Sequence, residues 1–174
     1  FEGESSSRFR VLRAFKNRFG AVNELGVFAM GERGLKEVSN PSAIFLSGQE
    51  QPTAGSAIMV TREGTRPLLV EVQALVDQSP LANPRRVALG LEQNRLAMLL
   101  AVLERRARVK VSEVEVYASV VGGVRLNEPG VDLALCLAVA SSIANRPLPN
   151  DMIACGEVGL AGEIRPVTGA HRRL

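Results

Sequence analysis

The chain has 174 residues, enough for one well-packed core or for one domain and part of another. Apolar residues make up 46% of it, which excludes a disordered protein, and the formal charge of +3 permits a nucleic-acid partner without requiring one. The sequence shows no run of about 18 apolar residues and no signal peptide, so we expect a soluble cytoplasmic protein without a membrane partner.

The N-terminal third alternates polar turns with short apolar runs. Ser5–Ser7 can cap a helix from about Arg8 to Asn17, because Phe9, Leu12 and Phe15 recur on one side. The elements expected after it are a strand at 25–30, a two-residue hairpin turn flanked by Gly31 and Gly34, a return strand at 35–38, and a short helix capped by 39–42 that ends by Gly48. A polar connection at 49–56 then predicts a domain boundary, with one domain at 1–50 and another at 51–174.

The second domain predicts a mixture of strands and helices. We expect strands at 57–61, 67–76, 114–121 and 152–155, helices at 92–107 and 131–144, and a hairpin around Gly159–Gly162. Leu96, Leu99, Leu100 and Leu103 should form the buried face of the first helix, and the second helix is apolar all round, which is typical of a helix at the centre of a fold.

Few residues in the second domain suggest chemistry. Asp132 opens the apolar helix, where we expect it to interact with the helix N-terminus and not to act as a catalytic acid, since no suitable partner is close in sequence. Glu157 and Glu163 flank a turn and are expected to be hairpin or interface charges. His171 is a poor catalyst candidate, the two cysteines are expected to be buried free thiols, and the chain offers no metal site.

Three arginines are candidates for DNA binding or for a subunit interface. Arg85 and Arg86 follow a proline-containing loop at the end of a strand-like run, and Arg125 continues a strand toward a turn. A guanidinium at such a place can donate paired hydrogen bonds to a phosphate or a carboxylate. The basic residues at the end of the 92–107 helix fit an ordinary solvated helix C-terminus.

The stretch from Gly122 to Pro166 resembles the proteolytic domain of the Lon family with its chemistry removed. In that family a serine follows an Asp-Gly-Pro turn, and a lysine follows a Gly-Glu hairpin. The resemblance places Gly130 at the serine position and Arg173 at the lysine position; glycine has no nucleophile, and arginine stays protonated. The resemblance implies an α/β protein whose second domain is a catalytically inactive Lon protease-like domain. That domain has an α+β, two-layer fold like that of ribosomal protein S5.

Lys16-Asn17-Arg18-Phe19-Gly20 is similar to the Lys-Asn-Arg-Phe-Gly motif of the RadA/Sms DNA repair proteins, and the resemblance covers essentially the whole chain. It implies that 1–50 is the C-terminal fragment of a RecA-like α/β ATPase domain, whose motif senses the neighbouring subunit's nucleotide. The resemblance further implies a homo-hexameric ring that hydrolyses ATP with magnesium and carries a zinc finger before Phe1. Such a ring acts on single-stranded or branched DNA in homologous recombination, where it promotes branch migration. The resemblance also implies a RecA-type recombinase as a protein partner.

No phosphate loop of the Gly-x-x-x-x-Gly-Lys-Ser/Thr type occurs in the chain, so this fragment is not expected to hydrolyse ATP or bind a cofactor by itself. Two other functions stay open. One is a purely structural oligomerisation domain. The other is a Lon-type peptidase with its nucleophile elsewhere, for which Ser119, Ser141 and Ser142 are the nearest hydroxyls, although none follows the turn.

Overall fold

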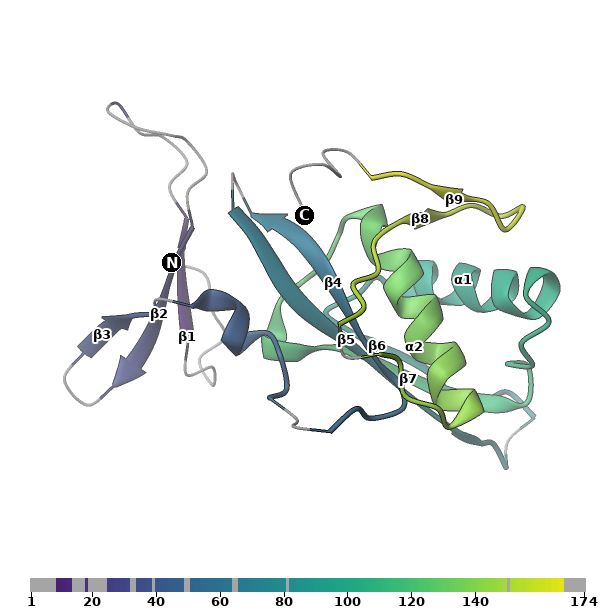
Figure 1. Ribbon diagram of the computed structural model, residues 1–174. Coiled ribbons are helices and arrows are strands. Elements are labelled where there is room, and N and C mark those ends of the chain that lie inside the picture. The colour runs from purple at the N-terminus through teal and green to yellow at the C-terminus, as the bar shows by residue number, and fades with distance from the viewer. Residues whose placement is uncertain are drawn as a thin grey trace.

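A computed structural model gives the structure of the chain. It describes residues 9–13, 18, 25–31, 34–38, 40–48, 51–63, 66–80, 82–149 and 151–167. Figure 1 shows a small sheet near the N-terminus and a larger unit of strands and helices. The prediction of a mixed α/β protein is confirmed. No helix within the described ranges is long and apolar enough to cross a membrane.

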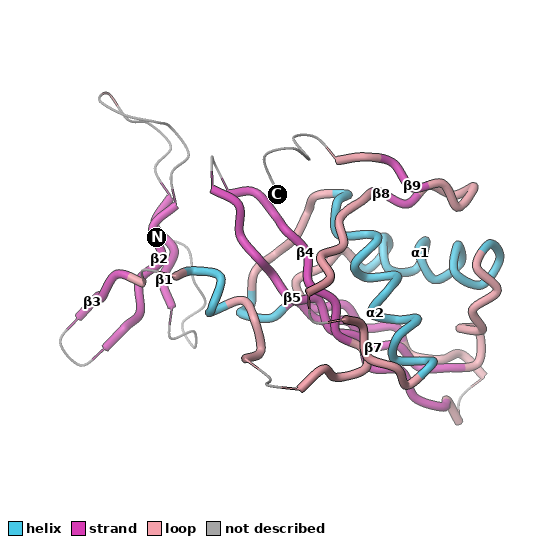
Figure 2. The backbone as a smooth tube through the Cα atoms, in the orientation of Figure 1, coloured by secondary structure: helices cyan, strands magenta, loops and turns pink. Residues whose placement is uncertain are grey.

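The small sheet contains β1 (Phe9–Arg13), β2 (Leu25–Gly31) and β3 (Gly34–Glu37), antiparallel in that order (Figure 2). The predicted strand at 25–30 is confirmed, and Gly31 faces Gly34 where the two-residue hairpin was expected. The predicted helix at 8–17 is wrong over Phe9–Arg13, which pairs with β2 from Phe9 opposite Ala29 to Arg13 opposite Leu25. A short apolar run fits the hydrophobic period of a helix as well as that of a strand, so the pattern does not decide between them. Here the pairing with β2 overrides a weak helix propensity.

The larger sheet has the order β4-β5-β7-β6, in which only the β6–β7 pair is parallel. Its strands are β4 (Ser56–Glu63), β5 (Arg66–Gln78), β6 (Arg86–Leu89) and β7 (Val114–Val120). Helices α1 (Gln93–Arg106) and α2 (Asp132–Ala144) pack on this sheet (Figure 1). The segment between the parallel strands β6 and β7 contains α1, as such a crossover requires.

One hydrophobic core joins both helices to the sheet. The four leucines predicted for the inner face of α1 are buried, and α2 adds fully buried small residues such as Ala134, Ala138 and Val139. Small side chains let α2 lie close to β5, with which it makes its largest contact. The helix ends at Asn145, whose φ of 47° is left-handed, a conformation that asparagine adopts more readily than most residues.

The segment before the expected domain boundary packs on the larger unit. After the 3-10 helix η1 (Pro41–Ile44), Phe45 is 4% exposed and belongs to the main core. A Cβ on Gly122 would lie 2.6 Å from Cδ1 of Phe45, so the φ of 82° at Gly122 and its lack of a side chain make room for the ring. The expected cap of η1 is not formed by Asn40; the Ser42 hydroxyl instead accepts a hydrogen bond from the Leu69 N–H.

Two expectations about the C-terminal half are corrected, and a third is confirmed. Strand β7 ends at Val120 and is followed by the 3-10 turn η2 (Val121–Gly123), so Arg125 lies in a loop. Residues 152–155 form a single parallel bridge, Ile58 to Ile153, in place of a strand. The predicted hairpin is confirmed as β8 (Glu157–Val158) and β9 (Ile164–Arg165), a two-stranded sheet of its own.

Candidate functional site

The turn before α2 is closed around a glycine. In the 3-10 helix η3 (Pro129–Val131), Gly130 is buried, and its carbonyl accepts a hydrogen bond of 3.1 Å from the Gly156 N–H. A Cβ at Gly130 would lie 3.0 Å from Cγ1 of Val167 and 3.2 Å from the Cys155 sulfur. Neighbouring side chains therefore fill the space that a larger residue would need.

Two nucleophilic side chains near this turn were not found by sequence reasoning. The Thr61 hydroxyl donates a hydrogen bond to Oε1 of Glu128, and the Cys155 sulfur lies 3.6 Å from the carbonyl oxygen of Val60. Thr61 is 67 residues from Glu128 in sequence, so no local spacing indicated the contact. Thr61 is thereby paired with a carboxylate, and Cys155 with a backbone carbonyl.

Two of the three serines considered as alternative nucleophiles are engaged elsewhere. Ser141 Oγ accepts a hydrogen bond from the Gly55 N–H at 3.0 Å and donates to the Arg146 carbonyl at 2.6 Å. Ser142 Oγ accepts one from the Val76 N–H at 3.1 Å. Both residues lie in the last turn of α2, away from Gly130 before its first turn, and bind neighbouring backbone there.

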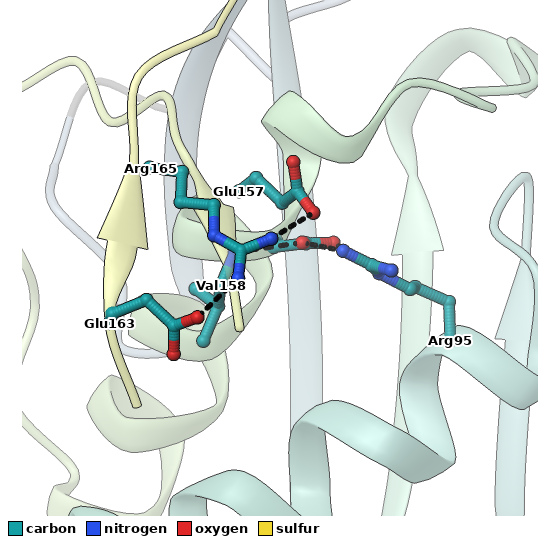
Figure 3. Close-up of polar contacts among 6 residues, drawn as sticks. Arg95, Glu157, Val158, Glu163 and Arg165 are labelled. Carbon is teal, nitrogen blue, oxygen red and sulfur yellow. Dashed lines mark hydrogen bonds and ion pairs between the residues drawn. The ribbon is translucent and has the colours of Figure 1, made fainter. Parts of the chain in front are cut away.

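Asp132 lies in the first turn of α2, as predicted, and its side chain is held by partners that the sequence did not predict. It makes no capping bond to α2. Its side chain, 0% exposed, accepts hydrogen bonds from Arg95 Nε at 2.9 Å, from the second nitrogen of the same guanidinium, and from the Val158 N–H at 2.9 Å (Figure 3). The hydrogen bond from Arg95 to Asp132 raises the pKa of Arg95. The ion pair joins α1, α2 and β8.

The hairpin carries the charges that the sequence predicted. Arg165 lies between two carboxylates in Figure 3, 3.6 Å from Glu157 and 2.5 Å from Glu163. Arg106 at the end of α1 adds a hydrogen bond of 3.4 Å to the Leu160 carbonyl in the hairpin turn. The two ion pairs lie within the hairpin, and the Arg106 hydrogen bond joins the hairpin turn to α1.

A pocket of about 330 Å³ opens beside the ion pair. Its lining is partly apolar and partly polar, and includes Leu91, Glu92, Arg95, Leu126, Asn127 and Glu128. Across the described part of the chain, no cluster of three or more His, Cys, Asp or Glu residues could hold a metal ion. The site therefore contains carboxylates and one arginine, but no assembled metal centre.

The three candidate arginines lie in different environments. Arg86 opens β6 and does not end a strand; its guanidinium donates to the carbonyls of Val111, at 2.5 Å, and Val114. Burial lowers the pKa of Arg86, against the opposing effect of Glu104. Arg85 and Arg125 are exposed, so their side chains are open to a partner, whereas Arg86 already binds its own backbone.

Several predicted residues lie outside the described ranges. Of the motif at 16–20, only Arg18 is described, and it is exposed at a bend. Lys16, Asn17, Phe19 and Gly20 lie outside, as do Arg173 and His171. Both cysteines are free thiols, but only Cys136 is buried as predicted, and Cys155 is partly exposed. Burial raises the pKa of Cys136 to about 12, so Cys136 stays protonated at neutral pH.

Fold and site together define a mixed α/β protein whose turn before the central helix α2 holds a buried glycine. No protein-family model matches the chain. Proteins named "DNA repair protein RadA" match it over 99–100% of its length: those of Salmonella typhimurium and Escherichia coli at 64% identity, and that of Pseudomonas aeruginosa at 63%. The chain spans 38% of these relatives' length. Over the part that it covers, the chain belongs to the RadA/Sms family of DNA repair proteins.

Proposed function

We propose that this chain acts in DNA repair as part of a RadA-type protein. The observation that carries the proposal is the 63–64% identity to proteins of that name along the whole chain. Identity at this level, without a gap in coverage, supports the same role for the corresponding part of the molecule. The full-length protein is then a cytoplasmic ATP hydrolase that depends on DNA and magnesium, with a zinc finger in its N-terminal part.

In this proposal, residues 1–50 end a RecA-like ATPase domain, and the motif Lys16–Gly20 senses the nucleotide of the adjacent subunit. A basic residue placed across a subunit boundary can stabilise the charge that develops during phosphoryl transfer. The exposed position of Arg18 agrees with a role toward another subunit. The motor assembles as a homo-hexamer and promotes branch migration of recombination intermediates that a RecA-type recombinase produces.

Residues 51–174 serve in this proposal as a Lon-like scaffold of the ring that does not cleave peptides. The buried glycine at the turn and the structural use of Ser141 and Ser142 support this assignment over a peptidase. Exposed Arg85 and Arg125 are the arginines through which such a scaffold would contact DNA phosphates. If the scaffold only assembles the ring, bound DNA will not protect these arginines in a footprinting experiment on the full-length protein.

The test uses full-length protein with Lys16→Ala, and Lys36→Ala as a matched control, because Lys36 is an exposed lysine on β3 outside the motif. We expect Lys16→Ala to lose DNA-stimulated ATP hydrolysis and branch migration while it keeps wild-type unfolding behaviour. The control should behave like wild type in all three assays. Wild-type hydrolysis and branch migration in Lys16→Ala would remove the motif from the mechanism.

A further inference from the structure

The turn between β8 and β9 presents an exposed apolar side chain at its tip. Leu160 is 67% exposed and, with Ile164 on β9 at 60%, is one of two exposed large apolar side chains on the hairpin. The Gly159 N–H donates to the Glu163 carbonyl, and the Gly162 N–H donates to the Gly159 carbonyl, each at 2.9 Å. The backbone of the tip is therefore closed by its own hydrogen bonds, and Leu160 is exposed on a formed turn.

The hairpin is anchored both at its base and at its tip. At the base, the Val158 N–H donates to the buried Asp132 carboxylate at 2.9 Å. At the tip, Arg106 Nε donates to the Leu160 carbonyl at 3.4 Å. A Cβ on Gly162 would lie 3.1 Å from Cβ of Arg106, so the turn packs directly on the end of α1, where Figure 1 shows it. A force on the tip is therefore transmitted to both helices.

Exposed basic side chains follow the end of α1 on which the tip packs. The Val109 N–H donates to the Leu103 carbonyl at 3.0 Å, which closes the helix end, and Arg108 adopts a φ of 57°. Glycine is the usual residue there, because a Cβ crowds the backbone in left-handed conformations. Strain at an exposed, charged position is a reason to look for a function. The exposed basic residues of this segment are Arg105, Arg106, Arg108 and Lys110.

The carboxylates near the tip do not cancel this positive charge. Residues 104–110 and 157–165 together hold five basic side chains and three carboxylates. Arg165 pairs with both carboxylates of the hairpin, and the carboxylate of Glu104 accepts hydrogen bonds from two backbone N–H groups of the following chain. Within the described ranges, the structure shows no ion pair for the three arginines in 105–108. The exposed leucine therefore lies beside arginines whose charge no carboxylate pairs with.

An apolar tip flanked by unpaired arginines fits a nucleic acid better than a protein partner. Guanidinium groups bind backbone phosphates, and apolar side chains such as leucine enter between stacked bases and unstack them. A stable protein interface buries about 800 Å² on each side around an apolar centre, and the two exposed apolar side chains of the hairpin make only a small part of that. Unstacking costs least where stacking is already interrupted, which favours a branch point over an intact duplex.

We propose that the β8–β9 tip is a wedge that inserts Leu160 at the branch point of a DNA duplex, while Arg105, Arg106 and Arg108 bind the phosphates beside it. The inference deepens the proposed role in DNA repair and rests on it. The inserted leucine takes the place of a stacked base, so the two strands stay apart at the branch point. Movement of the full-length protein along DNA then moves the opened position with it.

The test measures unstacking, with full-length protein and a forked DNA duplex that carries the fluorescent base 2-aminopurine at its branch point. Fluorescence of this base rises when the base is unstacked. The variants are Leu160→Ser and Leu160→Met, with Leu75→Ser as the control, because Leu75 on β5 is 63% exposed and lies outside the hairpin. We expect Leu160→Ser to lower the fluorescence rise and the branch-migration rate about fivefold at unchanged affinity for single-stranded DNA. Leu160→Met and the control should match wild type.

Arg108→Gly tests the phosphate contacts, because glycine suits the left-handed backbone at position 108 and removes the charge. We expect weaker binding to the fork, and a plot of log affinity against log salt that is shallower by about 0.9 for each lost contact. Arg62→Gln, which changes an exposed arginine on β4, is the control and should keep the wild-type slope.

Each outcome decides the proposal. A wild-type fluorescence rise in Leu160→Ser overturns the wedge, and a wild-type salt dependence in Arg108→Gly overturns the phosphate contacts. If Leu160→Ser sediments as a smaller assembly than wild type, the tip is a contact between copies and the proposal is wrong. If the wild-type protein itself does not bind the fork, the proposed function in DNA repair fails, which differs from a failure confined to the variants.

Discussion

The two buried carboxylates, Asp132 and Glu71, hold two different junctions of the molecule. Asp132 joins α1, α2 and β8 through Arg95 and the Val158 N–H. Glu71 on β5 is 4% exposed and accepts hydrogen bonds from the Ser47 N–H, at 2.6 Å, and the Ser56 hydroxyl, at 2.7 Å. It thereby binds both ends of the linker, the segment 47–56 between η1 and β4, to the sheet. Asp132 is balanced by a full charge, whereas Glu71 is balanced by neutral donors. The difference predicts how each junction fails.

Removing the cation from the first junction should have the largest effect. Arg95→Met leaves a fully buried carboxylate without its partner, which we expect to cost about 3–5 kcal/mol of unfolding free energy. Urea denaturation checks this value. The double variant Arg95→Met with Asp132→Leu removes both charges and should recover most of the loss. A single variant within about 1 kcal/mol of wild type would show that Asp132 does not depend on this pair.

The glycine in the same junction should also be sensitive. Gly130→Ser adds a Cβ 3.0 Å from Cγ1 of Val167 and 3.2 Å from the Cys155 sulfur, so these neighbours must shift, and overpacking of this kind costs about 1–3 kcal/mol. Gly123→Ser is a useful control, because no atom lies within 4 Å of the Cβ that it would add. Its φ of 70° is left-handed, so this variant measures the cost of backbone strain without overpacking. Gly130→Ser should not create peptidase activity, since a hydroxyl also needs a base. Cleavage of a fluorogenic peptide by Gly130→Ser would contradict the scaffold assignment.

These junctions also separate what the sequence could predict from what it could not. Periodicity located α1 and α2 with their buried faces, because leucine spacing and small-residue runs are local signals. The partner of Asp132 is 37 residues away on another helix, so the sequence placed Asp132 in the first turn of α2 but no local pattern encoded its ion pair. Gly130 could be named from a resemblance, but Val167 and Cys155, which fill its surroundings, come from the chain after α2.

The same limit explains the error at Phe9–Arg13. Five residues are too few for period alone to distinguish a helix from a strand, and the deciding interaction is the pairing with β2. Arg86 shows the converse case. Its sequence position indicated a charge presented to a partner, but the carbonyls that it binds belong to residues 25 and 28 positions further on.

The stability of the second junction, at Glu71, should depend on pH, and the expected change in unfolding free energy there is the smallest of the three. Burial acts to raise the pKa of Glu71, but hydrogen bonds from the Ser47 backbone, Gln73 and Ser56 together outweigh it and bring the pKa below its ordinary value of 4.5. A carboxylate with a lowered pKa stabilises the fold above pH 4.5, and this contribution is lost as the pH falls through the folded-state pKa. Glu71→Gln should therefore cost about 1–2 kcal/mol at neutral pH, because a neutral amide accepts these hydrogen bonds more weakly.

The difference between Glu71→Gln and wild type should shrink as the pH falls below 4.5, since protonation makes the wild-type side chain neutral as well. Urea denaturation of both proteins over a pH series measures the difference directly. Asp77→Asn, an exposed carboxylate on the same strand, serves as the control and should show no such convergence. A Glu71→Gln deficit that stays constant with pH would mean that shape, and not charge, holds the linker to the sheet, and the contrast between the two carboxylates would then be lost.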